Sequence, residues 1–325
     1  MIEILSNGAP NLIQDLGRRG HLGIGVSRGG AMDSMALSLA NALVGNDEDA
    51  AGVEISLFPF RVRFQTVTHF AVTGADCIVR LDDEVLAPWW GRLARAGQTL
   101  VIERPKRGAR GYLALAGGVE VDPIMGSRST DLKGAFGGYQ GRGLRRGDTL
   151  KLNGHTVRQN QAAGLGIVPK ELPAFWKELS AGRVTVRAIR AAEYEYFTKT
   201  AHNALVQTDY EITPDANRVG YRLSGEPLPL QVARELLSHG IVAGTVQVPP
   251  SGQPIIQLAE ANTCGGYPKI ATVIEADLWK LAQAPIGSRI RFDLVDVDSA
   301  IDALRTRTAE ARRIRQTLAL MAQRD

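Results

Sequence analysis

Short apolar runs separated by turn residues dominate the first half of the chain. Between Glu54 and Leu152 these runs are RVRF, HFAVTG, CIVRL, TLVIE, YLALAGG and DTLKL. Runs of this length, divided by turn signals, are typical of antiparallel strands. Their number and spacing predict a sheet that is closed into a barrel or folded into a sandwich.

The β pattern stops after Asn153 and resumes beyond Gly182. VTVRAI (184–189) is the first new run, and in RIRFDL (289–294) apolar and charged residues alternate as in a half-buried strand. The intervening polar stretch is therefore the expected boundary between two β-rich domains. We predict a first domain at 1–155, a linker at 156–182, a second domain at 183–297 and a C-terminal helix at 298–325.

Helical periodicity is confined to a few segments. Apolar residues recur at helical spacing in 31–44 and again towards the C-terminus, where Ser299 is the expected cap. A short helix is also predicted over 231–238. Asp33, in the first turn of the first helix, is either a helix cap, the commoner role, or a functional acid.

Composition limits the possible classes of protein. With 325 residues and 44% hydrophobic content the chain can bury a large core. No apolar run is long enough to cross a bilayer and no secretory signal opens the sequence, so we expect a cytoplasmic protein without a membrane partner. The two cysteines lie in no metal-binding motif, so no metal site is expected.

The net charge of +4 makes the chain mildly basic for its length. Arginines cluster in RPKRGAR (104–110) and RGLRR (142–146), but no nucleic-acid recognition motif accompanies them. The clusters are therefore interpreted as solvated faces, or as surfaces for a small anionic substrate or an acidic partner, and not as a nucleic-acid site.

One stretch, 247–273, carries the densest set of polar groups. Two apolar runs flank a turn that contains Glu260 and Lys269 as candidate catalytic groups. Gly265 and Gly266 would let backbone amides point at an oxyanion or phosphate. Polar side chains in the same turn would bind substrate; they are Asn262, Thr263 and Tyr267.

Two further Gly-rich loops are candidates for the same cleft. GSRSTDLKGAFGG (126–138) offers Arg128, Ser129 and Thr130, and PDANRVGYRL offers Arg218. A guanidinium matches the planar geometry of a carboxylate or phosphate. We expect these loops, drawn from both halves of the chain, to meet around a small carboxylate substrate, with Asp33 as a weaker catalytic candidate.

Four ordered motifs resemble one family along nearly the whole chain. They are IQDLGRRGHLGIGVSRGGAMDSMALSLANALVGND, YLALAGGVEVDPIMGSRSTDLKGAFGG, NRVGYRL followed by ELLSHGI, and GTVQVPPSGQPI followed by GGYPKIA. The chain is similar to the carboxyltransferase A/B module, or allophanate hydrolase subunit 2 family, whose members include the C subunit of 5-oxoprolinase and the Kip antagonist protein. The fourth motif adds Gln247 and Gln253 as binding candidates. Family members usually have Asp, Gln and Thr in place of Glu260, Asn262 and Cys264.

The resemblance implies a mainly β fold of two tandem cyclophilin-like β-barrel subdomains, subdomain A-like and subdomain B-like, with a few short helices. It implies carbon–nitrogen bond chemistry in partnership with a C/D module. In the 5-oxoprolinase setting, the A, B and C subunits together open the lactam of 5-oxoproline to glutamate with ATP and Mg. The nucleotide is then held by this chain or by a partner, of which the B subunit carries the C/D module.

Two alternatives follow from the same family. One is urea-carboxylase-like carboxyl transfer, in which biotin would arrive on another chain. The other is a non-catalytic antagonist that binds a regulator of a kinase.

Overall fold

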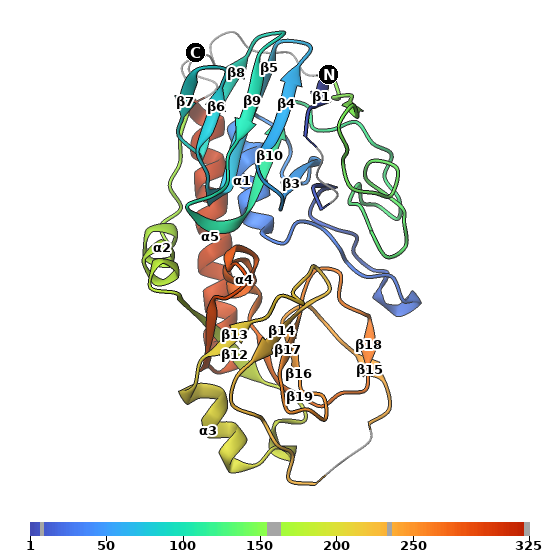
Figure 1. The fold of residues 1–325 in the computed structure, drawn as a ribbon, viewed down its shortest axis with the longest axis vertical. Helices are drawn as coiled ribbons and strands as arrows, with labels where there is room; N and C mark the ends of the chain where they lie inside the picture. The colour runs from blue at the N-terminus through green and yellow to red at the C-terminus, as the bar shows by residue number, and fades with distance from the viewer. Residues whose placement is uncertain (7–9, 155–163, 233–235, 322–325) are drawn as a thin grey trace. The chain divides into compact units, whose positions relative to one another are not determined.

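The computed structural model describes residues 1–6, 10–154, 164–232 and 236–321, which form two compact units (Figure 1). Unit 1 is made of Met1–Arg18, Gly29–Lys170 and Ala309–Asp325. Unit 2 is made of Arg19–Arg28 and Glu171–Thr308. The division after Lys170 falls within the predicted linker. Two segments belong to other units than the predicted ranges give: Arg19–Arg28 is part of unit 2, and Ala309–Asp325 is part of unit 1.

Unit 1 contains two antiparallel sheets. The first has six strands in the order β11 (Thr149–Leu150), β1 (Ile2–Ile4), β4 (Phe60–Phe64), β9 (Thr99–Ile102), β6 (Val79–Leu81) and β7 (Glu84–Leu86). The second has five, in the order β2 (Leu12–Gln14), β3 (Gly52–Ile55), β10 (Arg107–Leu115), β5 (Thr68–Asp76) and β8 (Trp90–Ala94). Of the two arrangements expected from the sequence, this unit adopts the sandwich.

The core of unit 1 is formed by the inward residues of both sheets. Phe64 of β4 and Phe70 of β5 are at most 1% exposed, and their ring centroids lie 5.3 Å apart. In β4 the buried residues alternate with exposed arginines, as the sequence pattern predicts. This alternation fixes which face of the strand enters the core.

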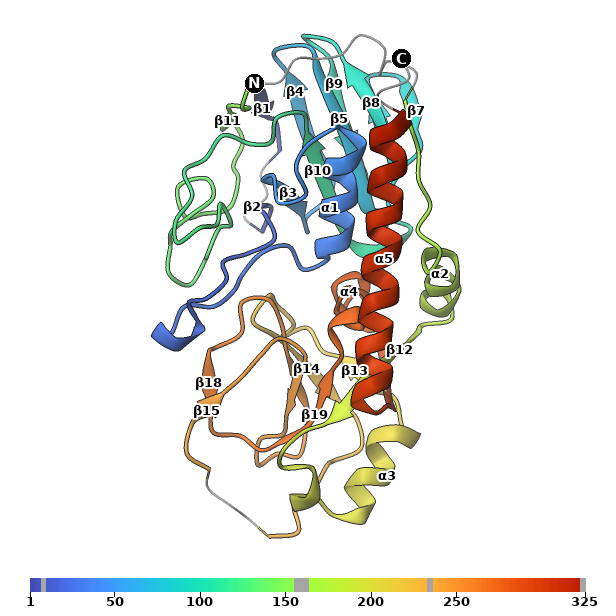
Figure 2. The same ribbon diagram turned by 180° about the vertical axis from the view of Figure 1, so that it is seen from behind.

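Helix α1 (Ser34–Leu43) covers the outer face of the five-stranded sheet (Figure 2). Its residues Ala40 and Leu43 pack on Ala71 of β5 and Ala114 of β10. Leu318, near the end of helix α5 (Val297–Met321), joins the same cluster. Small residues at these sheet positions let the helices approach closely.

Unit 2 is built on a closed seven-stranded barrel. Its strand order is β12 (Arg183–Arg190), β19 (Lys269–Val273), β16 (Thr245–Gln247), β17 (Ile255–Gln257), β14 (Gly220–Ser224), β13 (Tyr210–Ile212) and β20 (Arg289–Leu294). The parallel pair β12–β20 closes the barrel, with Val184 opposite Ile290. Both side chains are fully buried, so the predicted alternating strands supply the interior.

Short helices and one ribbon surround the barrel. The helices are α2 (Leu172–Ser180), α3 (Lys199–Gln207) and α4 (Leu278–Gln283), with 3-10 turns η1 (Leu22–Ile24), η3 (Tyr194–Tyr196) and η4 (Glu275–Asp277). The ribbon pairs β15 (His239–Gly240) with β18 (Cys264–Gly265). No helix in the described part of the chain is both long and apolar enough to cross a membrane.

The stretch 247–273 connects two strands, as predicted, and β17 and β19 each pair with β16 instead of with each other. Two local predictions need correction. Residues 231–232 and 236–238 are not helical, and 233–235 lie outside the described residues. Helix α5 begins before Ser299, whose amide donates to the side chain of Asp296 at 2.7 Å, so Asp296 supplies the cap.

Candidate functional site

Lys269 begins strand β19 at one end of the barrel. It lies opposite Gln247 of β16, which in turn lies opposite Ile255 of β17. The Lys269 residue is only 9% exposed, yet its ammonium has no hydrogen bond or ion pair with any residue that the structure describes. A largely buried cation without a counter-charge attracts an anionic ligand.

Glu260 lies beyond the other end of the barrel. Its backbone amide donates to the Arg218 carbonyl, just before β14. At the same end of the barrel, Val273 at the end of β19 donates its amide to the carbonyl of Gly244, just before β16. Between Glu260 and Lys269 the chain runs the length of the barrel, which is about 13 Å for the five residues of β19. The expectation that both groups occupy one turn is therefore wrong, because a middle strand separates β17 from β19.

Arg218 and Glu260 form a buried ion pair. Arg218 Nε donates to Glu260 Oε1 at 2.6 Å, and the side chains are 8% and 5% exposed. Both of these candidate groups are thus engaged with each other. Such a pair holds the loop after β17 against the start of β14.

Glu193, which the sequence did not single out, connects the barrel to the β15–β18 ribbon. Its carboxylate accepts from the Lys269 backbone amide at 3.2 Å and lies 3.2 Å from Nε2 of His239. His239 Nδ1 lies 2.9 Å from the Leu237 carbonyl. Nδ1 must donate to that carbonyl, whereas Nε2 makes no hydrogen bond within the described residues, so its approach to Glu193 is a charge contact only when the imidazole is protonated. A His in a family-like motif was the only sequence signal for this contact.

Two predicted glutamines organise the Lys269 end of the barrel. Gln257 donates its side-chain amide to Gln247 Oε1 at 2.9 Å. Gln253 exchanges two bonds with the backbone of Gly225, at 2.8 Å and 3.1 Å, and so fixes a loop. A Cβ at Gly265 would come within 2.9 Å of the Gln247 amide nitrogen, so a larger residue there would displace the end of the Gln247 side chain.

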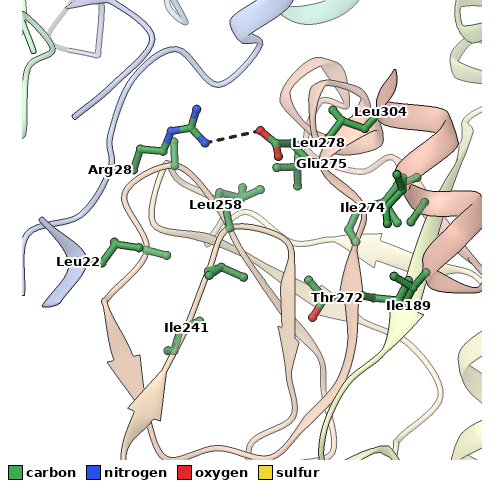
Figure 3. A pocket seen from close by; sticks show the side chains of 18 of the residues that line it. Leu22, Arg28, Ile189, Ile241, Leu258, Thr272, Ile274, Glu275, Leu278 and Leu304 are labelled. Carbon is green, nitrogen blue, oxygen red and sulfur yellow. Dashed lines mark ion pairs between the residues drawn. The ribbon is translucent and has the colours of Figure 1, made fainter. Parts of the chain in front are cut away.

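Gly266 and Tyr267 line a cavity of about 610 Å³. Pro249, Pro250 and Pro268 contribute to its apolar wall, and Tyr267 is 47% exposed. Asn262 and Arg28, by contrast, line a second cavity of about 490 Å³ in the same unit (Figure 3). The polar residues of the 247–273 stretch are therefore distributed over several surfaces of unit 2.

In unit 1, the 126–138 loop is held by Asp15. This buried carboxylate accepts from the hydroxyls of Ser127 and Ser129, at 2.6 Å and 2.5 Å, and from the backbone amides of Gly17 and Arg128. Thr130 donates its hydroxyl to the Ile13 carbonyl at 3.0 Å. Ser129 and Thr130 are fully buried, so both side chains serve the loop's own structure.

Arg18 supports the same loop from the first motif. Its guanidinium donates to the Ser129 carbonyl at 2.6 Å and lies over the Phe136 ring, 4.7 Å from the centroid. The QDLGR segment was the available signal for Asp15 and Arg18. Sequence reasoning missed Asp15 because a buried hub cannot be distinguished from a solvated charge without the fold.

Asp33 is the N-cap of α1. Its carboxylate accepts from the Ala36 amide at 3.1 Å, and its own amide donates to the hydroxyl of Tyr112. Tyr112 donates to Glu54 at 2.9 Å. Burial, followed by the nearby charges of Glu54 and Asp33, raises the pKa of Tyr112 well above its ordinary value. The phenol therefore stays neutral and ties α1 to the sheet.

Metal ligands are not gathered in the described part of the chain, where no three His, Cys, Asp or Glu side chains are placed to hold an ion. The relative positions of the two units are not determined, so the predicted meeting of loops from both halves stays a prediction. Within unit 2, the candidates form two separate groups, one around Lys269 and one around Arg218 and Glu260.

A family profile described as carboxyltransferase domain, subdomain A and B, matches residues 24–294. The chain is 42% identical to the C subunit of 5-oxoprolinase from Escherichia coli strain K12 over 93% of this chain and 94% of that protein. It is 41% identical to the C subunit of 5-oxoprolinase from Haemophilus influenzae over 92% of this chain and 93% of that protein. It is also 30% identical to urea amidolyase of Lachancea kluyveri, of which it covers 17%.

Solved structures show the same fold. The crystal structure of TTHA0988 matches with a TM-score of 0.78 and 34% identity, over 90% of this chain and 55% of that chain. The urea carboxylase of Kluyveromyces lactis matches with a TM-score of 0.86 and 27% identity, over 96% of this chain and 29% of that chain. The chain thus spans about half of one structural relative and under a third of the other.

Proposed function

Because this chain belongs to the carboxyltransferase subdomain A and B family, we propose that it is the C subunit of an ATP-dependent 5-oxoprolinase complex. One observation carries the proposal: 42% identity to a protein named as the C subunit of 5-oxoprolinase, matched over more than nine tenths of both chains. In this function the chain acts with the A and B subunits to activate and cleave the lactam of 5-oxoproline, which gives glutamate.

The chemistry requires groups that hold negative charge. A lactam carbonyl is a poor electrophile, and transfer of the γ-phosphoryl group of ATP to its oxygen makes the carbon open to attack by water. Catalysis then depends on positioning two anions and stabilising the charge that develops. ATP would bring Mg and would be held by this chain or by a partner subunit.

We assign the charge-holding role to Lys269. The residue is 9% exposed and its ammonium has no partner among the described residues, so the charge is available to a carboxylate or phosphoryl group. Gly265 and Gly266 precede it and would supply amides to an oxyanion, with Gln247 as a neighbouring donor. The substrate carboxylate would bind here or at Arg128 in the 126–138 loop, where Ser129 and Thr130 would support the loop and not contact the substrate.

Glu260 and Arg218 take a supporting role in this proposal. They lie at the opposite end of the barrel and are paired at 2.6 Å, so neither is placed to share one small substrate with Lys269. Asp33, which caps α1, is the weakest of the catalytic candidates.

The test is reconstitution of the chain with candidate A and B subunits. We expect Lys269→Met to reduce oxoproline-dependent ATP hydrolysis at least about 100-fold, since a preorganised charge contributes that much, and Lys269→Arg to retain part of the activity. Met matches the volume of the lysine stem, so the fold should persist. Lys199→Met, at an exposed position of α3, is the matched control. Unchanged turnover in Lys269→Met would remove this residue from the mechanism.

A second function is favoured by a separate observation, the 30% identity to urea amidolyase. In that case the chain would take part in carboxyl transfer from biotin carried on another chain. Turnover of urea that avidin inhibits, with none of oxoproline, would replace the first proposal by this one. A tight complex without any turnover would favour the non-catalytic antagonist.

A further inference from the structure

The cavity of about 490 Å³ in unit 2 has an almost entirely aliphatic wall (Figure 3). Ile189 and Ile274 line it from β12 and the end of β19, Leu258 from the loop after β17, and Leu304 from α5. Its volume is in the range of small-molecule sites, which are mostly apolar with a few convergent polar groups. The proposed substrate, 5-oxoproline, is a small polar lactam acid and would leave most of this apolar wall without contacts. The lining of the cavity therefore does not match the proposed substrate.

One hydroxyl interrupts the aliphatic wall. Thr272 of β19 points its side chain into the cavity (Figure 3). Among the residues that the structure describes, this hydroxyl has no hydrogen-bond partner. The neighbouring strand offers a contrast, because Thr245, directly opposite, accepts from the Val242 amide at 3.3 Å. Thr272 is thus available to a polar atom of a ligand.

A single ion pair lies at the edge of the cavity. Arg28 Nη1 is 3.6 Å from Glu275 Oε1, and the side chains are 44% and 60% exposed. A contact of this length between exposed groups is weak, because solvent screens both charges. The guanidinium keeps its other donors for a second carboxylate.

The two partners of this pair are not equivalent. Glu275 is in the first turn of η4, directly before α4, where helix amides favour a negative charge without help from Arg28. Arg28 has no other hydrogen bond or ion pair within the described residues. An incoming carboxylate therefore gains Arg28 at little loss to Glu275, whereas an incoming ammonium would leave Arg28 unpaired.

We propose that this cavity binds an amphipathic carboxylic acid, with its carboxylate on Arg28 and its apolar body against the aliphatic wall. Thr272 then recognises a polar atom within the body of the natural ligand. The site is separate from the one assigned to Lys269, so it adds a second ligand to the proposed function.

The test is calorimetric titration of the full chain with three probes of equal chain length: decanoate, decanol and decylamine. We expect decanoate to bind at least about tenfold more tightly than the other two. Arg28→Ala should reduce this preference to about twofold or less, and Ala300→Trp, at a position that lines the cavity, should weaken all three probes at least about tenfold. Leu304→Glu places a carboxylate on the aliphatic wall at a position that is 36% exposed. It should weaken the binding of decanoate more than that of decanol or decylamine, because the two carboxylates repel each other.

Two matched controls accompany these variants. Thr272→Val keeps the shape of the wall and should leave decanoate within about threefold of wild type, since decanoate has no polar atom in its body. Arg289→Ala removes an exposed arginine of the same unit and should change nothing. Equal binding of decanoate and decanol, an undiminished preference in Arg28→Ala, or unweakened binding in both Ala300→Trp and Leu304→Glu would overturn the proposal.

Discussion

The buried Arg218–Glu260 pair gives a sharp prediction for Glu260→Gln. The Nε–Oε1 distance is 2.6 Å and the side chains are 8% and 5% exposed, so neither charge has solvent to replace its partner. Removing one member of such a pair destabilises a protein by about 3–5 kcal/mol, because the other charge is left buried. The glutamine oxygen still accepts a hydrogen bond, so we expect about 3 kcal/mol.

Urea unfolding measures this loss. If the free energy of unfolding falls by about 2 kcal/mol per M urea, a loss of about 3 kcal/mol lowers the midpoint by about 1.5 M. Trp176 and Trp279 are buried in unit 2 and report on its unfolding by fluorescence. Hydrogen exchange shows whether the loss of stability is greatest in β14 and β17, since β14 begins and β17 ends beside the ion pair.

An exposed ion pair supplies the control. Asp302 and Arg305 are 74% and 77% exposed, so Asp302→Asn should cost less than about 1 kcal/mol. The double variant Arg218→Met with Glu260→Gln should be more stable than the sum of the single changes predicts, because it removes both charges of the pair. A midpoint for Glu260→Gln within 0.3 M (roughly 0.6 kcal/mol) of wild type would refute the reasoning. It would also free Glu260 for a catalytic role.

Two further predictions concern buried carboxylates. Asp15→Asn should destabilise unit 1 by about 3 kcal/mol, because four donors converge on this carboxylate and an amide satisfies only part of them. Thermal unfolding measures this loss, with Asp47→Asn at an exposed position as the control. Equal melting temperatures for the two variants would contradict the prediction. Burial alone would raise the pKa of Asp277, but hydrogen bonds from Arg187 and the charge of Lys280 lower it below its ordinary value. Because the pKa of Asp277 is lower in the folded protein, its stabilisation is complete above about pH 3.9 and is lost as the pH falls through the folded value. Wild type should therefore lose more stability than Asp277→Asn between pH 5 and about pH 2. Acid titrations followed by circular dichroism measure this difference. Parallel acid titration curves for the two proteins would argue against the ion pair as the source.

Much of the architecture follows from periodicity in the sequence. Alternation in RVRF and RIRFDL predicts strands β4 and β20, whose buried and exposed residues follow that period. Helical spacing after Asp33 predicts α1 with its cap. Both patterns are local, since a strand or helix must present one face to a core wherever that core lies.

The site was less accessible from the sequence. Neighbours such as Glu260 and Lys269 were expected in one turn, but β16 inserts between their strands and places them at opposite ends of the barrel. Asp15, Glu193 and Arg28 gained their importance only from partners more than 75 residues away in the sequence. No local pattern encodes such pairings.

The sequence by itself determined the strands, the main helices and the family, because these depend on residue types at fixed spacing. Only the tertiary structure decided which charges are neutralised and which stay available. Arg218 and Lys269 read alike as cations beside glycines, yet one is buried against a carboxylate and the other has no partner among the described residues. That difference is set by strand order, since the order of strands in a barrel brings distant side chains together or keeps adjacent ones apart.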